Sequence, residues 1–135
     1  MTPFIWRSRV YWEDTDAGGV VYYANYLKFL ERARTEWLRA RGIVQSELAA
    51  SERLVFAVIA VDVQYLRPAR LDDELCISCE PARDGAVSVK FAQRIWRPAE
   101  PEAFLIEAQI RVACLDAAAF RPRRLPPVVL AELPE

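Results

Sequence analysis

Apolar and polar residues alternate at helical spacing between residues 23 and 41. The apolar positions recur three and four residues apart at Tyr26, Phe29, Leu30, Ala33, Trp37 and Leu38. This spacing places them on one face and predicts an amphipathic helix from about Tyr23 to Arg41, ended by Gly42. The charged positions are assigned to the other faces: Lys28, Glu31, Arg32, Arg34, Glu36 and Arg39. Two i,i+3 ion pairs, Glu31–Arg34 and Glu36–Arg39, are expected on them.

Alternating and β-branched patterns predict strands in most of the remaining chain. The expected strands span Phe4–Trp12, Leu54–Leu66, Glu74–Glu80, Val87–Trp96 and Phe104–Leu115. The run Leu54–Leu66 is apolar and β-branched, which predicts a central strand covered on both faces at its start. Asp84-Gly85 predicts a tight hairpin, and Val44–Ala50 a short second helix. One long helix followed by hairpin-linked strands predicts an α+β fold, with one antiparallel sheet wrapped over the helix.

Length and composition favour one packed domain. The 135 residues leave room for one core, so a single domain over 1–135 is predicted. Its Pro-rich tail, from about residue 121, is expected to add a short edge segment or to be loose. A hydrophobic content of 53% and a net charge of −1 give no argument for a nucleic-acid partner. No apolar run approaches a membrane span or a signal core, so a cytoplasmic location is expected.

The cysteine and histidine content limits the chemistry. Three cysteines, an odd number, argue against a disulfide framework. Cys76 and Cys79 should point to opposite faces of a strand, so buried core residues are expected and not a shared metal or redox pair. The absence of histidine excludes Ser-His-Asp and Cys-His catalysis and histidine-based metal sites. Catalysis would rest on carboxylates, hydroxyls, basic side chains or backbone dipoles, and no metal or cofactor is expected.

An acidic glycine turn precedes the predicted helix. Asp14 and Asp16 come at the end of the first predicted strand, and Gly18-Gly19 follow. The first N–H groups of a helix lack an intrahelical acceptor and carry partial positive charge, so this order places a carboxylate and free donors around one small volume. The alternative for Asp16 is a structural role as a helix N-cap or turn carboxylate whose side chain bonds to nearby N–H groups, and Asp14 is interpreted as structural or orienting. A phosphate-binding loop is disfavoured because no Lys-Ser/Thr pair follows the glycines.

Two motifs carry a resemblance to a known family. The sequence DTDAGGVVY at 14–22, followed by Asn25-Tyr26 and ERAR at 31–34, resembles the opening motif of hotdog-fold acyl-CoA thioesterases. It is most similar to the 4-hydroxybenzoyl-CoA thioesterase-like family and, within it, to the Tol–Pal-associated acyl-CoA thioesterases. The sequence RPARLDD at 67–73 matches the family's turn between two strands. The resemblance extends from about Arg9 to Leu115.

The resemblance implies a hotdog fold and hydrolysis of an acyl-CoA thioester, with CoA present only as part of the substrate. It also implies a homodimer, often paired into a homotetramer, with active sites at the subunit interface. The family's catalytic aspartate matches Asp16, which would attack the thioester carbonyl or deprotonate a water. The family's carbonyl-polarising backbone N–H falls at about Tyr23. Many relatives carry a histidine near that position, so a role of that histidine cannot operate in this chain.

Several further residues are candidates for substrate binding. The candidates are Gly19, Val20, Asn25, Tyr26, Arg67, Arg70 and Arg83. Tyr26 has a core role as its alternative. The three arginines and Lys90 are candidates for the CoA phosphates, with an ordinary solvated charge as the alternative. Glu31 is a second candidate carboxylate, with a solvated or ion-paired role as the alternative.

Two other functions remain open at this stage. One is thioester hydrolysis on acyl groups held by acyl carrier protein, which needs a basic docking rim. The other is a non-catalytic acyl-binding or scaffold protein that keeps the fold. A hotdog dehydratase is less favoured because those enzymes generally rely on a catalytic histidine. The acyl group, the oligomer size and the choice between nucleophile and general base are not determined by the sequence.

Overall fold

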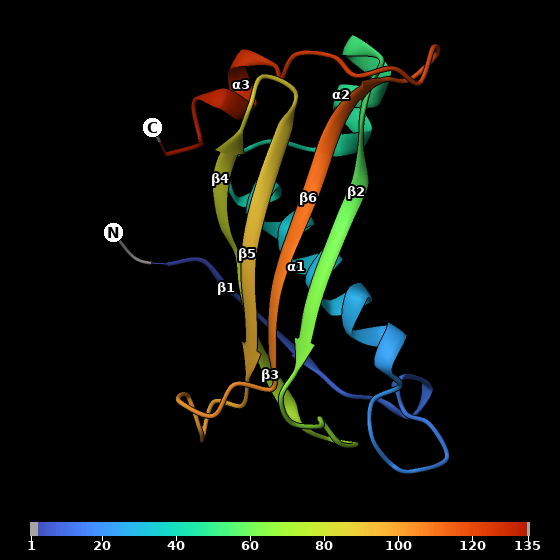
Figure 1. The fold of residues 1–135 in the computed structure, drawn as a ribbon, viewed down its shortest axis with the longest axis vertical. Coiled ribbons are helices and arrows are strands. Elements are labelled where there is room, and N and C mark those ends of the chain that lie inside the picture. The colour runs from blue at the N-terminus through green and yellow to red at the C-terminus, as the bar shows by residue number, and fades with distance from the viewer. Residues whose placement is uncertain (1–2, 135) are drawn as a thin grey trace.

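A six-stranded antiparallel sheet packed against one long helix dominates the computed structural model, which describes residues 3–134 (Figure 1). The strands are β1 (Ile5–Arg9), β2 (Leu54–Tyr65), β3 (Glu74–Ser78), β4 (Glu80–Asp84), β5 (Ser88–Trp96) and β6 (Ile106–Asp116). The helices are α1 (Tyr26–Ala40), α2 (Gln45–Glu52) and α3 (Pro127–Leu130), with 3-10 turns at Trp12–Asp14 and Tyr23–Asn25. The strand order is β1-β3-β5-β6-β2, with β4 paired to β5. This confirms the predicted α+β class.

Helix α1 buries the face that its sequence pattern predicted. All six predicted apolar positions are buried. The helix begins three residues later than predicted, because a 3-10 turn precedes it, and it ends at Ala40 ahead of Gly42 with φ +77°. The Glu36–Arg39 ion pair forms, with Nε and Oε1 3.4 Å apart.

The assignment of Arg34 to a solvent face is wrong. Arg34 is buried, and its guanidinium donates to Gln93 Oε1 of β5 at 3.1 Å, so the expected ion pair with Glu31 is absent from the described residues. Gln93 lies on the buried face of β5 and also donates to the Leu30 carbonyl at 3.0 Å. A hydrogen-bonded pair can occupy a core where an unpaired polar group would be costly.

The two central strands follow their predicted alternation. Val89, Phe91 and Ile95 of β5 are buried, as are the alternate residues of β6 from Ile106 to Cys114. Because side chains on a strand alternate between faces, one face of the sheet meets α1 and the other faces outward.

Strand β2 is not central as predicted but lies at the edge of the sheet. It pairs with β6 alone among the described strands, with a bulge between Val58 and Ala60. Its apolar run is therefore only partly covered, and Val58, Ile59 and Val61 are each about half exposed. An apolar run in the sequence does not by itself distinguish a central strand from an edge strand.

Two predicted strand boundaries need correction. The first strand ends at Arg9 and not at Trp12, because the Asp14 carboxylate accepts the Tyr11 N–H at 2.8 Å and turns the chain. The strand predicted to end at Glu80 continues as β4 to the Asp84-Gly85 hairpin, which is confirmed. The interruption lies at Cys79, next to Ser78, whose hydroxyl accepts the Arg94 N–H at 2.9 Å.

The Pro-rich tail is packed and not loose. It pairs with β6 through a bridge from Leu115 to Pro122, forms α3, and buries Leu125 and Val129 in the core. All three cysteines are free and buried, which confirms the burial predicted for Cys76 and Cys79. Among residues 3–134 no helix is long and apolar enough to cross a membrane, and no cluster of acidic or cysteine side chains is arranged to hold a metal ion.

Candidate active site

Asp16 lies in a tight loop that fixes one of its carboxylate oxygens. The Gly18 N–H donates to Asp16 Oδ1 at 2.8 Å, and the Gly19 N–H donates to the Asp16 carbonyl at 3.0 Å. Gly19 has φ +80°, a conformation that glycine adopts without steric cost. A β-carbon on Gly18 would lie 3.1 Å from Asp16 Oδ1. The loop therefore holds an exposed carboxylate, one oxygen of which accepts the Gly18 N–H.

Asp14 has a structural position two residues earlier. It is 8% exposed, and its carboxylate caps the 3-10 turn at the Tyr11 N–H. Its carbonyl accepts two further bonds, from the Tyr22 N–H at 2.9 Å and from Asn25 Nδ2 at 3.0 Å. These bonds tie the Asp16 loop to the turn that opens α1. Because the first strand has already ended, Asp14 and Asp16 do not share a strand face.

The 3-10 turn at Tyr23–Asn25 presents two backbone donors. The Asn25 N–H donates to the Tyr22 carbonyl at 2.8 Å, whereas the N–H groups of Tyr23 and Ala24 have no hydrogen-bond acceptor within residues 3–134. Such free N–H groups at the start of a helix carry partial positive charge and favour a nearby anion. Within residues 3–134, the Asp16 loop thus supplies a carboxylate, and the 3-10 turn that follows it supplies the unpaired N–H groups of Tyr23 and Ala24.

Tyrosine side chains gather around this turn. The Tyr22 and Tyr23 rings lie 4.9 Å apart, and the Tyr65 ring meets Tyr23 at 6.4 Å and Tyr26 at 5.6 Å, both edge-on. The Tyr65 hydroxyl donates to the Tyr23 carbonyl at 2.9 Å. The pKa of the Tyr22 phenol is raised, chiefly by the Tyr23 side chain and more weakly by the Asp16 carboxylate. Both neighbours disfavour a phenolate, so Tyr22 keeps its proton.

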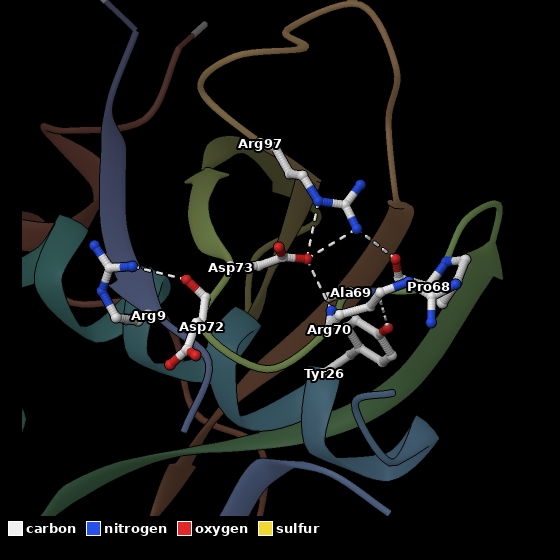
Figure 2. A network of polar contacts seen from close by, with 8 residues as sticks. All are labelled: Arg9, Tyr26, Pro68, Ala69, Arg70, Asp72, Asp73 and Arg97. Atoms are coloured by element: carbon white, nitrogen blue, oxygen red, sulfur yellow. Dashed lines mark hydrogen bonds and ion pairs between the residues drawn. The ribbon is translucent and has the colours of Figure 1, made fainter. Parts of the chain in front are cut away.

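The loop 66–73 forms a second wall against the Asp16 loop. The Val21 N–H donates to the Ala69 carbonyl at 2.8 Å, and Val20 forms a bridge with Arg70. Ala69 is fully buried, and its N–H donates to the Tyr26 hydroxyl at 3.0 Å (Figure 2). Burial raises the pKa of Tyr26, so its hydroxyl is neutral and can accept this bond. Tyr26 is thus both a core residue and an anchor of the loop.

A carboxylate–guanidinium pair closes the loop 66–73. Asp73 Oδ2 accepts Arg97 Nε at 2.9 Å and the Arg70 N–H at 2.8 Å, and Arg97 also donates to the Pro68 carbonyl at 2.7 Å (Figure 2). The Asp73 and Arg97 side chains are only 22% and 23% exposed. Charge-assisted bonds in a sheltered place are stronger than those on an open surface, so this pair fixes the loop.

The structure gathers some of the predicted site residues and separates others. Gly19 and Val20 belong to the Asp16 loop itself, and Arg70 forms a bridge with Val20. Asn25 bonds to the nearby Asp14 carbonyl, and Tyr26 bonds to Ala69 of the adjoining loop. The exposed Arg67 lies in the adjacent loop, where its guanidinium donates to the Phe104 carbonyl at 2.8 Å.

Two candidate cations lie elsewhere in the fold. Arg83 is in the β4–β5 hairpin, at the opposite end of the sheet from the Asp16 loop (Figure 1). Lys90 is exposed on β5, paired across the sheet with Arg111. The second candidate carboxylate, Glu31, lines a cavity of about 120 Å³ between α1 and the sheet, beside Arg34 and Trp37. The fold of the single chain does not bring these groups to Asp16.

Sequence reasoning missed three residues of this region. Tyr65, Asp73 and Arg97 each hold the site through partners that are 24 to 42 residues away along the chain. Tyr65 and Asp73 flank the RPAR turn, which is the signal that marks their neighbourhood. The sequence around Arg97 does not indicate its partner, because a charged residue before a proline is common at the end of a strand.

Comparison with known proteins adds a separate finding. The family model "Thioesterase superfamily" matches residues 18–104. The Acyl-CoA thioester hydrolase YbgC of Escherichia coli O6:H1 is 47% identical over 131 residues, 97% of this chain and 96% of that protein. The Acyl-CoA thioesterase YbgC of Haemophilus influenzae is 41% identical over 128 residues, 95% and 92% of the two chains. A solved Bartonella henselae structure, described as a probable thioesterase, has a TM-score of 0.86 at 35% identity, covering 93% and 100%.

Proposed function

The chain belongs to the thioesterase superfamily, and we propose that it is an acyl-CoA thioesterase that hydrolyses the thioester to a free acid and CoA. The observation that carries the proposal is the pairing of an exposed carboxylate, held by the Gly18 N–H, with unpaired backbone donors at the opening of α1. Hydrolysis of a thioester needs an oxygen nucleophile at the carbonyl carbon and donors for the oxyanion that forms.

Asp16 supplies the oxygen chemistry in this proposal. Either its free oxygen attacks the carbonyl carbon to give a mixed anhydride, or it takes a proton from a water that attacks. In both routes the C–S bond breaks and the thiolate leaves. In the first route, water then hydrolyses the anhydride and regenerates the carboxylate. A thiolate is a good leaving group, so the chemistry is compatible with a chain that contains no histidine.

The Tyr23 N–H is the proposed oxyanion donor. Its peptide group is oriented because the Tyr22 carbonyl accepts the Asn25 N–H at 2.8 Å. A preorganised donor stabilises the developing negative charge without reorganisation during the reaction. This group belongs to the backbone, so the proposal does not require a histidine at position 23. The reaction as proposed uses no metal and no cofactor, and CoA enters only as part of the substrate.

Arg70 and Arg67 are the proposed contacts for the CoA phosphates. Both are exposed, and Arg70 is placed next to Val20 by the bridge between the two loops. A guanidinium binds phosphate oxygens in a bidentate manner. Arg83 lies at the far end of the sheet and would take part only across a subunit interface.

We also propose that the protein is a homodimer that pairs its β2 edges. Strand β2 is long, leaves one side of its backbone without a partner in the described protomer, and exposes about half of Val58, Ile59 and Val61. An open apolar edge is normally covered, and twofold pairing covers both copies at once. Sedimentation of wild-type protein and of Ile59→Glu tests this, with the variant expected to be monomeric. The same runs distinguish a dimer from a tetramer.

A cytoplasmic location fits this proposal. The three cysteines are all free, as expected in a reducing compartment. Fractionation of cells that express the full chain would test it, and recovery with the membranes or outside the cell would contradict it.

Thiol release from short, long and aromatic acyl-CoAs, by wild-type protein and by Asp16→Asn, tests the proposed reaction. Turnover that collapses in the variant supports it, and the best substrate then defines the acyl preference. Matched acyl groups on acyl carrier protein test the alternative substrate class. Tight binding of acyl-CoA without turnover by the wild-type protein would contradict the proposal and favour the non-catalytic alternative.

A further inference from the structure

Tyr65 connects the edge strand to the turn that carries the proposed oxyanion donor. It is the last residue of β2, and its hydroxyl donates to the Tyr23 carbonyl at 2.9 Å. Its ring is held edge-on against Tyr26, which is 3% exposed and is itself anchored by the Ala69 N–H. The reaction described above does not use this hydroxyl.

The bond fixes a backbone group of the turn that opens α1. The Tyr23 carbonyl and the Ala24 N–H belong to one planar trans peptide group, so the direction of the carbonyl sets the direction of the N–H. The Ala24 N–H has no acceptor within residues 3–134. The preceding peptide group is oriented in the same way, because the Tyr22 carbonyl accepts the Asn25 N–H. Two consecutive peptide groups are therefore held by their carbonyls while their N–H groups stay available.

We propose that Tyr65 is a positioning residue that aims the Ala24 N–H as a second oxyanion donor beside that of Tyr23. This inference rests on the proposed thioesterase function. Accepting a hydrogen bond at the carbonyl also polarises the peptide group and makes its N–H a stronger donor. Tyr65 is about half exposed, but it ends a strand of the sheet and its ring lies edge-on against the buried Tyr26, so the protein scaffold sets the direction of the donor before substrate binds.

Tyr65→Phe removes the hydroxyl and keeps the ring contacts, so it isolates the hydrogen bond. The variant is expected to lower kcat about tenfold, less than the loss of an entire oxyanion donor, and to leave KM within about twofold. Tyr11→Phe is the matched control, since Tyr11 is 62% exposed and no side-chain hydrogen bond from its hydroxyl is found within the described chain. The control is expected to keep the wild-type kcat, and urea unfolding of both variants is expected to match wild type.

The stretching frequency of a bound carbonyl group measures the hydrogen bonds that its oxygen accepts from the protein. The probe is a ¹³C-labelled ketone analogue of the best acyl-CoA, with a methylene group in place of the thioester sulfur. Donors to its oxygen lower the carbonyl stretching frequency, and Tyr65→Phe is expected to shift the frequency back toward its value in water. A merely structural role would leave this frequency unchanged.

Replacement of the Ala24 amide by an ester, through incorporation of lactate at that position, removes the N–H itself. In that background Tyr65→Phe is expected to cause no further loss of kcat, because both changes act on one donor. Full additivity of the two losses would overturn the inference. If Tyr65→Phe had the same kcat and the same carbonyl frequency as the wild-type protein, the inference about Tyr65 would be overturned. The proposed function would stand. Absence of wild-type turnover on every acyl-CoA would instead count against the proposed function.

Discussion

The end of the sheet that carries the Asp16 loop and the end that carries the β4–β5 hairpin are stabilised by different interactions. At the first end, side chains bond to backbone groups of neighbouring loops, as Asn25 does to Asp14 and Asp73 does to Arg70. At the second end, the tail folds back and buries Leu125 and Val129.

One end of the sheet has interactions that fix the local backbone geometry, and the other has interactions that mainly stabilise the fold. Polar side chains that bond to loop carbonyls and N–H groups fix the backbone direction near Asp16, yet they leave the donors of Tyr23 and Ala24 unpaired in the described chain. Apolar burial at the other end contributes free energy without specifying a geometry to a fraction of an ångström. We therefore expect changes near Asp16 to affect kcat or KM, and changes near the tail to affect mainly unfolding.

The largest effect on stability is expected at the hairpin end. Leu125→Ala should lower the free energy of unfolding by about 3 kcal/mol, because Leu125 is 3% exposed and its removal leaves a cavity. The kcat of the folded protein should stay at the wild-type value. Urea unfolding and thiol-release assays on the same samples check this, and a large fall of kcat with unchanged unfolding would contradict the separation.

A smaller loss is expected when the loop 66–73 is released. Asp73→Ala removes the acceptor for both Arg97 and the Arg70 N–H and should lower the free energy of unfolding by about 2 kcal/mol. KM for acyl-CoA should rise severalfold, since the loop carries the proposed phosphate contacts. Arg7→Ala, which breaks the exposed pair with Glu74, is the control and should cost less than about 0.5 kcal/mol. If both variants lost the same free energy of unfolding, the low exposure of the Asp73–Arg97 pair would not contribute to stability.

The two glycines of the Asp16 loop should respond differently to the same substitution. Gly18→Ala puts a β-carbon 3.1 Å from Asp16 Oδ1, so the carboxylate must shift and kcat should fall about tenfold with little change in unfolding. Gly19→Ala meets no atom within 4 Å but strains a backbone at φ +80°, so it should cost about 1 kcal/mol of stability. Kinetic and urea measurements on both variants test the contrast, and a reversed pattern would refute it.

The last effect is absent at neutral pH and is a pH dependence of stability that starts above neutrality. Burial raises the pKa of the Cys79 thiol to about 12, whereas an unfolded cysteine titrates near about 8.5. The folded state keeps the proton that the unfolded state loses, so this contribution is complete below pH of about 8.5 and declines as pH rises. The expected slope is about 1.4 kcal/mol per pH unit. Urea unfolding between pH 8 and 10 should show a shallower slope for Cys79→Ala, and an identical slope would contradict the assignment.

Much of the fold follows from local patterns in the sequence. The apolar spacing of α1 and the alternation of β5 and β6 are strong because each of these elements has one face on the core. The position of β2 could not be predicted, because the same apolar run fits a central strand or an edge covered by another subunit. Arg34 was misplaced because its partner Gln93 is 59 residues away along the chain.

The candidate site also contains residues that the sequence identifies and residues that only the structure identifies. The candidates Asp16, Gly19 and Val20 share one short loop, so they are close together in any fold that keeps it. The roles of Asp73 and Tyr65 depend on loops that meet only in the folded sheet, and local sequence carries no signal for such pairings. The geometry around Asp16 is thus recognisable from the sequence, whereas the residues that hold it in place are not.

The most direct test applies one substitution to two carboxylates that lie two residues apart. Asp14→Asn and Asp16→Asn both keep an oxygen that can accept the local N–H bond, from Tyr11 and from Gly18 respectively, so both variants should fold. Thiol release from the best acyl-CoA should fall by about 10³-fold in Asp16→Asn and stay within a few fold of wild type in Asp14→Asn. Near-normal turnover in Asp16→Asn, or an equal loss in both variants, would contradict the assignment of the chemistry to Asp16.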